Sequence, residues 1–266
     1  MLLVILVYLA LGAVAGVVAG LFGIGGGLLI VPVLVFSFEL QGMSPEVLTH
    51  AAVATSLATI VATSISSTLA HNKKGAVRWD IFKPVAIGLV LGSFLGVNTA
   101  TLMPGEWLQI LLGCFVILVA SQMAFNLKPE AGETTVNNRD LVLSGGVIGW
   151  LSSIFGIGGG TLSVPYFTWR RVQMQQAVAT SAACGLPIAL MGAVTNVWAG
   201  WQHPLMPEWS AGFVYLPAFL GIVITSSIFA KYGAKLAHSL SPLLLKRIFA
   251  VFLLGVGLRF LITNLT

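Results

Sequence analysis

Two stretches of the chain combine closely spaced glycines with a proline inside otherwise apolar sequence. Residues 22–32 read FGIGGGLLIVP, and residues 155–165 read FGIGGGTLSVP. Glycine weakens a helix and lets a ligand or a second backbone come close to its amide groups. If a new helix begins directly after the glycines, its first N–H groups and the positive end of its dipole attract anions. The motif therefore predicts a binding site for a small anion.

The amino-acid composition indicates whether the chain is surrounded by water or by lipid. The chain has 266 residues, of which 57% are hydrophobic and only 8% are charged, far below the charged fraction of about 25% in soluble domains. A span needs roughly 20 apolar residues, and six runs reach or approach this length. They are residues 47–70, 81–102, 107–127, 175–200, 210–230 and 243–262. The sequence predicts an all-α integral membrane protein.

A second repeated motif indicates an internal duplication. AVATS occupies residues 52–56 and again residues 177–181, in each case after a glycine motif. Two matches in the same order indicate two homologous halves. We expect one membrane repeat in residues 1–127, a polar cytoplasmic linker in residues 128–140, and a second membrane repeat in residues 141–266.

Charge indicates how the halves are oriented, because cytoplasmic loops of membrane proteins collect Lys and Arg. Twelve of the 13 basic residues fall in four clusters, and Arg259 stands apart. The loops at residues 39–46, 103–106 and 201–209 contain acids and no base. The segment after the first glycine motif ends at an acidic loop, whereas its counterpart ends at Arg170. We therefore expect two inverted-topology repeats, each a glycine-broken helical hairpin plus three full transmembrane helices. The alternative is eight spans in two parallel halves.

Broken helices at corresponding points of inverted halves are typical of a transporter substrate site. Hydroxyl groups in the AVATS motifs and after the second glycine motif add neutral donors. Alternatively, these hydroxyls bond helix carbonyls, and glycines such as Gly88, Gly92 and Gly96 only allow close helix crossing. The expected substrate-binding residues are Gly23, Gly25, Gly26, Gly27, Thr55, Ser56, Gly156, Gly158, Gly159, Gly160, Thr161, Ser163, Thr180 and Ser181.

The sequence lacks the motifs expected for nucleotide binding, for serine hydrolysis or for metal binding. The glycines do not have the G-x-G-x-x-G spacing of a dinucleotide site, and no G-x-S-x-G motif is present. No Asp or Glu lies inside a predicted span, and the histidines and the two cysteines have no metal-ligand spacing. We expect no enzyme, no cofactor and no metal. Without a buried carboxylate to carry a coupling ion, export of an anion from a negative interior is the simplest direction of transport.

The motifs resemble those of the sulfite exporter TauE/SafE family of membrane permeases. The resemblance rests on FGIGGG with a following proline and AVATS in both halves, and on residues 66–79, 185–193 and 215–226. It implies movement of small sulfur-containing anions such as sulfite, sulfonates or thiosulfate across the bacterial cytoplasmic membrane. The second half departs from this pattern at residues 198–203. Trp198, Gly200, Trp201 and His203 there replace the basic, glycine-bearing loop that follows the matching span of the first half.

The expected function is thus a multi-pass transporter that exports small sulfur oxyanions by alternating access around a midplane site. Its expected partners are the anion and the lipid bilayer, and no nucleic acid. An anion channel of similar selectivity is one alternative. A second is a membrane factor without transport activity that docks soluble proteins through its basic loops.

Overall fold

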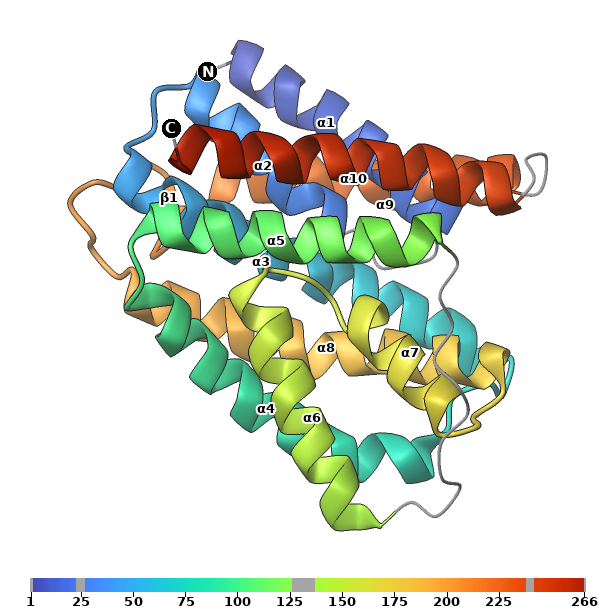
Figure 1. Ribbon diagram of the computed structural model, residues 1–266. Helices are drawn as coiled ribbons and strands as arrows, with labels where there is room; N and C mark the ends of the chain where they lie inside the picture. Colours follow the sequence, from blue (N-terminus) through green and yellow to red (C-terminus); the bar gives the residue numbers. More distant parts are fainter. Residues whose placement is uncertain (1, 23–26, 126–136, 238–241, 266) are drawn as a thin grey trace.

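The computed structural model describes residues 2–22, 27–125, 137–237 and 242–265, and it is helical almost throughout (Figure 1). The first half of the chain forms α1 (Leu2–Phe22), α2 (Gly27–Leu40), α3 (Pro45–Lys73), α4 (Trp79–Thr101) and α5 (Gly105–Ala124). The second half forms α6 (Asn138–Ile154), α7 (Gly160–Trp169), α8 (Met174–Ala199), α9 (Leu216–Ala237) and α10 (Pro242–Leu265). This architecture confirms the expected all-α class.

Five helices in the described part of the chain are long and apolar enough to cross a bilayer. They are α3, α4, α5, α8 and the segment Arg247–Leu265 of α10. Five of the six expected spans are therefore confirmed. The sixth, expected over residues 210–230, begins later, because a short hairpin of β1 (Ser210–Ala211) and β2 (Val214–Tyr215) precedes α9. Gly212 turns the chain there with a φ of +57°, a conformation that glycine adopts without strain.

Helix α4 has an exposed apolar face of the kind that contacts lipid. On α4, Ile87, Leu91 and Leu95 form a stripe that is 58–59% exposed, and such a stripe is stable in hydrocarbon rather than in water. The three glycines expected to allow close crossing lie on α4 as well. A methyl group added at Gly88 or Gly92 would overlap backbone carbonyl oxygens of α6. The packing role predicted for these glycines is confirmed.

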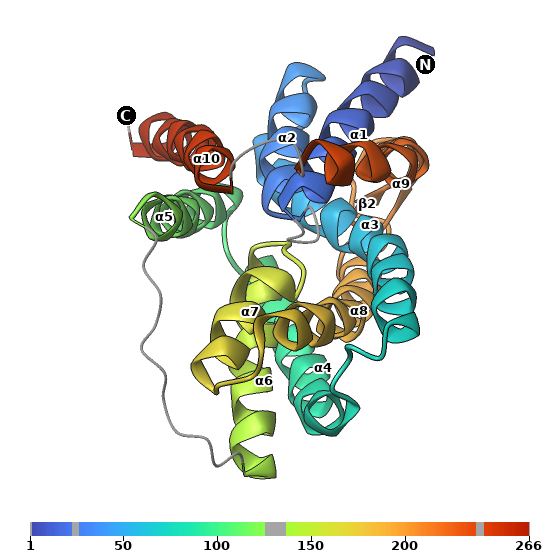
Figure 2. The same cartoon turned by 90° about the vertical axis from the view of Figure 1, so that its right-hand side faces the viewer.

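The long helices pack mainly in pairs. α1 lies along α9, α4 along α6, α5 along α10, and α3 along α8. In Figure 2, α3 lies below α1, α2 and α9, α8 lies below α3 and beside α7, and α4 and α6 lie lower still. The two AVATS motifs therefore lie on the helices at the centre of the molecule.

The broken segments approach this centre from two directions. α1 and α2 lie in the upper part of both cartoon views, and α6 and α7 lie in the lower part (Figures 1 and 2). α2 is enclosed by protein, since Leu28, Val31, Leu34 and Phe38 are at most 3% exposed. Each short helix leads back towards the end of the molecule from which the preceding helix comes.

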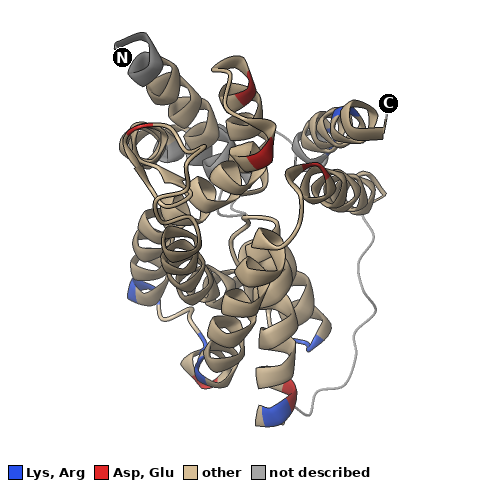
Figure 3. Cartoon of the chain, turned by 90° about the vertical axis from the view of Figure 1, so that its left-hand side faces the viewer, with Lys and Arg blue, Asp and Glu red and all other residues tan. Residues whose placement is uncertain are grey.

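The loops divide by charge between the two ends of the molecule. The α2–α3, α4–α5 and α8–α9 connections lie together at one end, called here the acidic end (Figure 1). The α3–α4 and α7–α8 connections and the start of α6 carry Lys and Arg at the other end, called here the basic end (Figure 3). The segregation that the sequence predicts is thus present in the described residues.

Candidate functional site

The second glycine motif ends one helix and begins another. Gly156 has a φ of +64°, and its N–H donates to the Ser153 carbonyl oxygen over 3.4 Å. The Ile157 N–H donates to the Ser152 carbonyl oxygen over 2.9 Å. These two bonds form the Schellman ending of a helix, which requires a left-handed residue at the position of Gly156. The first glycine of this motif therefore terminates α6.

The glycines that follow leave amide groups without partners. The N–H groups of Gly158, Gly159 and Gly160 donate no hydrogen bond to any part of the chain that the structure describes. Gly160 is the first residue of α7, so these groups lie at the positive end of a helix dipole. Unpaired N–H groups at membrane depth are costly unless they face water or a ligand.

The interruption between α6 and α7, residues 155–159, is called here the second break. The structure brings it against the beginning of α2. A Cβ atom at Gly27 would lie 3.0 Å from the Ile157 Cα and 3.1 Å from the Gly156 carbonyl oxygen. A Cβ atom at Gly156 would lie 2.8 Å from Val31. Only glycine permits this approach. The two glycine segments therefore meet in the interior, as far as the described residues reach; Gly23, Gly25 and Gly26 lie outside them.

The serines of the two AVATS motifs hold the second break in place. Ser56 on α3 donates to the Gly156 carbonyl oxygen over 2.7 Å, and Ser181 on α8 donates to the Gly159 carbonyl oxygen over 3.1 Å. Both side chains are fully buried. Because both hydroxyls bond carbonyl groups, the neighbouring amide groups remain free for another acceptor.

A pocket of about 40 Å³ lies beside these free amides, between α3, the second break, α7 and α8. A cavity of about 10–15 Å³ is enough for one water molecule, so the pocket has room for a small anion. None of its lining side chains is charged. The lining consists of Ile60, Thr63, Ser64, Ser67, Gly158, Gly159, Gly160, Val164, Val178, Ser181, Ala182 and Gly185. We call this space the inner pocket.

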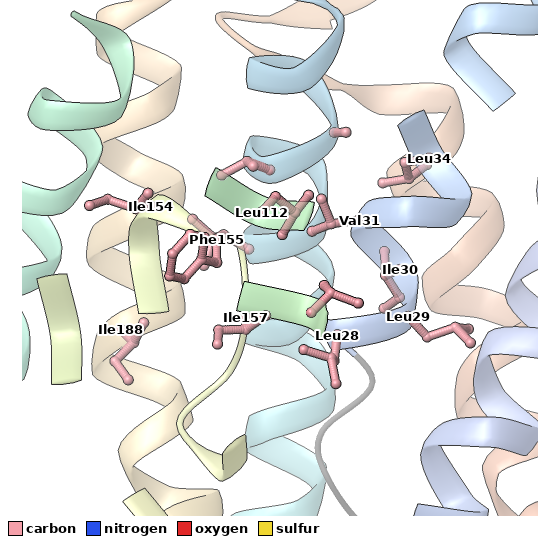
Figure 4. Close-up of a cluster of buried hydrophobic side chains, with 14 of the residues drawn as sticks. Leu28, Leu29, Ile30, Val31, Leu34, Leu112, Ile154, Phe155, Ile157 and Ile188 are labelled. Carbon is pink, nitrogen blue, oxygen red and sulfur yellow. The ribbon is translucent and has the colours of Figure 1, made fainter. Parts of the chain in front are cut away.

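Hydrocarbon side chains fill the region on the other side of the break. Leu28, Val31, Leu112, Phe155 and Ile157 belong to one buried cluster (Figure 4). The rings of Phe155 and Phe115 are stacked there, with centroids 4.3 Å apart. The inner pocket lies along the C-terminal part of α3, which leads to the basic end. Its free space therefore lies beside the second break, and packed side chains separate it from the acidic end.

Two predicted residues are directed elsewhere. Thr55 accepts a hydrogen bond of 3.0 Å from the Tyr215 N–H just before α9. Thr180 accepts one of 3.0 Å from the Arg78 N–H just before α4. Each threonine thus caps the start of another helix, and neither lines the inner pocket.

Three hydroxyl groups of α7 have no hydrogen-bond partner among the described residues, whereas the Thr168 hydroxyl donates to the Val164 carbonyl oxygen over 2.9 Å. The hydroxyl oxygens of Thr161 and Ser163, both predicted site residues, are buried and unpaired, as are the Tyr166 hydroxyl and the Arg170 Nε. The Arg170 guanidinium lies 4.8 Å from the centre of the Trp169 ring. Neither Thr161 nor Ser163 lines the inner pocket, although both lie on the helix that begins at it.

The sequence prediction missed three hydroxyl residues of α3 that line the pocket. Thr63, Ser64 and Ser67 follow Ser56 at intervals that place them near one face of a helix. The signal was present in the TSISST run at residues 63–68. It is weak in isolation because hydroxyls in membrane helices commonly bond their own backbone, as the Thr63 hydroxyl does with the Ile60 carbonyl oxygen over 3.2 Å.

The helices and the pocket define the class of protein: a multi-pass helical membrane protein with a polar pocket at a helix break, typical of transporters. The profile of the sulfite exporter TauE/SafE family matches residues 8–260. The chain belongs to this family, and the protein is a membrane transporter rather than an enzyme.

Individual relatives agree with this assignment. A probable membrane transporter protein of Haemophilus influenzae is 38% identical over 256 residues, which cover 96% of this chain and 97% of the relative. One from Methanocaldococcus jannaschii is 29% identical over 91% of this chain and 89% of its own length. YunE of Bacillus subtilis, also named a probable membrane transporter protein, is 29% identical over 75% of this chain and 81% of its own length. No solved structure matches the chain.

Proposed function

We propose that the protein exports small sulfur oxyanions, such as sulfite, sulfonates or thiosulfate, from the cytoplasm of a bacterial cell. The observation that carries this proposal is the inner pocket with its unpaired amides at Gly158, Gly159 and Gly160. Oxyanion oxygens accept several hydrogen bonds at once, and helix N-termini are common sites for such groups. The family description, sulfite exporter TauE/SafE, supports the sulfur chemistry.

The neutral lining of the pocket suits transport. Amide N–H groups and the hydroxyls of Ser64 and Ser67 stabilise an anion without a buried Lys or Arg. Charged pairs would bind the anion more tightly, and a tight ion pair must be broken in every transport cycle. A site made of neutral donors therefore combines selectivity for anions with release.

We further propose that the two halves are inverted repeats that alternate access to the pocket. Matching α1–α5 with α6–α10 in order converts the α1–α9 pair into the α6–α4 pair, and it maps α3–α8 and α5–α10 onto themselves. The threonine caps correspond too, since Thr55 caps α9 and Thr180 caps α4. In this arrangement the pocket communicates with the basic, cytoplasmic end, while the cluster around Phe155 and Leu112 closes the acidic, outer end.

The direction follows from the membrane potential. A monovalent anion that leaves a cell with a negative interior gains about 2.3 kcal/mol per 100 mV. The inner pocket has no carboxylate among its lining residues that could carry a coupling proton or sodium ion. Uncoupled export needs neither.

The proposal is tested by sulfite flux from proteoliposomes with Gly158→Ala and Gly255→Ala variants. A Cβ atom at Gly158 would lie 3.4 Å from Ile60 and would narrow the pocket without touching backbone, whereas one at Gly255 meets nothing within 4 Å. We expect Gly158→Ala to reduce the flux about tenfold through crowding of the site, and Gly255→Ala to leave it unchanged. Equal flux in all three proteins, or no oxyanion flux in the parent protein, would contradict the proposal.

A further inference from the structure

A second cavity lies at the acidic end of the molecule, remote from the inner pocket. It occupies about 230 Å³ between α2, α3, α5 and α10. Val35, Leu48 and Phe260 supply apolar walls, and Glu39, Glu106, Gln109, Arg259 and Asn264 supply polar groups. None of the glycine or AVATS residues lines it. We call this space the outer cavity.

Arg259 gives the outer cavity a cation that its surroundings otherwise lack. The other Lys and Arg residues lie in the four basic clusters of the sequence, whereas Arg259 lies beside Glu39, near the end of α2. Its guanidinium carbon lies 4.0 Å from the centre of the Phe36 ring. This cation–π contact holds the planar group beside the cavity.

The guanidinium is only partly used by the protein. Its Nη2 donates one hydrogen bond to the Glu39 Oε2 over 3.0 Å, which also joins α10 to α2. A guanidinium has five N–H donors, and the remaining four donate no hydrogen bond to the described part of the chain. Donors in this planar fork match the oxygens of an oxyanion.

The pair with Glu39 is of a kind that exchanges readily. The side chains of Arg259 and Glu39 are 51% and 49% exposed, and exposed pairs of this type contribute little to stability because water and salt screen them. An incoming anion that accepts two hydrogen bonds can therefore displace the single contact of Glu39. When the anion leaves, the carboxylate returns.

The opposite wall is fixed by a chain of amides. Asn264 donates to the Gln109 Oε1 over 2.8 Å, and Gln109 donates to the Thr49 hydroxyl over 3.0 Å. These bonds link α10, α5 and α3 and orient the amide of Gln109, whose second N–H remains available. The cavity therefore has a built polar wall facing an incompletely paired cation.

We propose that the outer cavity is a second, low-affinity binding site for the same class of small oxyanion. Arg259 is its binding residue, and Glu39 is an internal competitor for the guanidinium. This inference rests on the proposed transport function and adds the step after the inner pocket. The lining includes two acidic residues, Glu39 and Glu106, and one basic residue, Arg259, so its formal net charge is −1. Weak binding follows, which suits the end of the pathway at which an exported anion is released.

The experiment is equilibrium binding of radiolabelled thiosulfate to the purified full-length protein. We expect a weaker site that Arg259→Gln abolishes, and that Glu39→Gln tightens about threefold to tenfold because a competing charge is removed. Arg139→Gln and Asp140→Asn serve as matched controls, since both residues are exposed at the basic end. Neither should change the weaker site.

The binding and flux measurements distinguish the outer site from the alternatives. Loss of binding in Arg139→Gln equal to that in Arg259→Gln, or no change in Glu39→Gln, overturns the proposal. Sodium binding that disappears in both Glu39→Gln and Glu106→Gln would make the cavity a cation site instead. If proteoliposomes carry no oxyanion but the Arg259-dependent site is present, the transport proposal fails and the outer site stands. If they carry sulfite and this site is missing, the outer site alone fails.

Discussion

Hydroxyl side chains near the second helix break fall into two groups that differ in their partners. Ser56 and Ser181 donate to carbonyl groups of the break, and Thr55 and Thr180 accept from backbone N–H groups. The hydroxyl of Ser67, by contrast, lines the inner pocket without a hydrogen bond to any residue that the structure describes. The first group holds the structure together, and the second is free to contact a ligand.

This difference predicts opposite effects of two similar substitutions. Ser56→Ala leaves the Gly156 carbonyl oxygen without its buried donor and should lower the free energy of unfolding by about 1 kcal/mol. Ser67→Ala removes no bond within the protein, but it removes a donor to the anion. It should leave stability unchanged and weaken sulfite binding about fivefold. Thermal unfolding and sulfite titration of both variants distinguish these effects, and a stability loss in Ser67→Ala equal to that in Ser56→Ala would contradict the assignment.

The sequence predicted residue types better than residue roles. The glycine motif required positive φ and close approach, and Gly156 and Gly27 provide them. The roles of Thr55 and Thr180 could not be predicted, because each bonds a backbone group more than 100 residues away. The contribution of Thr63 and Ser64 could not be predicted either, because the pocket forms only where α3 meets residues of the second half of the chain. A hydroxyl in an apolar helix does not indicate which neighbour it faces.

At the scale of elements, glycine-rich contacts set the distances between paired helices. Gly88, Gly92 and Gly96 of α4 contact the backbone of α6, and Gly145 and Gly149 of α6 contact α4 in return. α5 and α10 approach in the same manner at Gly113 and Gly257. Without a hydrophobic driving force in lipid, such close packing is a main source of helix association.

Gly92→Ala should therefore destabilise the α4–α6 pair. The added methyl group would overlap the Gly146 carbonyl oxygen, so we expect unfolding to become easier by about 1–3 kcal/mol. Gly146→Ala is the control in the same interface, since its methyl group would meet only the Gly88 carbonyl oxygen at 3.9 Å. Unfolding of both variants in detergent, followed by circular dichroism, measures the difference. Equal stability of the two variants would contradict the close contact between α4 and α6 at Gly92.

Five of the six spans predicted from apolar length are present, but the start of the sixth was placed too early. Residues 210–215 are apolar enough to continue the helix. The positive φ at Gly212 nevertheless turns them into a hairpin, and the Tyr215 N–H is then held by Thr55. Hydropathy cannot detect such a tertiary contact. The paired motifs, by comparison, predicted which segments approach one another, since Gly27 contacts the second break.

At the scale of the whole molecule, the two ends differ in charge and in access to the centre. The inner pocket lies on the side of α3 that leads to the basic end, and a hydrocarbon cluster around Phe155 and Leu112 lies on the other side. The Arg259–Glu39 pair joins α10 to α2 at the acidic end. These features suit a carrier that receives its anion from the cytoplasm.

The central claim is that the free amides of Gly158, Gly159 and Gly160 bind the transported anion. An experimental structure of the full-length protein with thiosulfate, whose sulfur atoms give strong density, tests it most directly. We predict density in the inner pocket with oxygen atoms about 2.9 Å from these amide nitrogens. An anion bound elsewhere, with the amides paired to protein or sealed by side chains, would contradict the account.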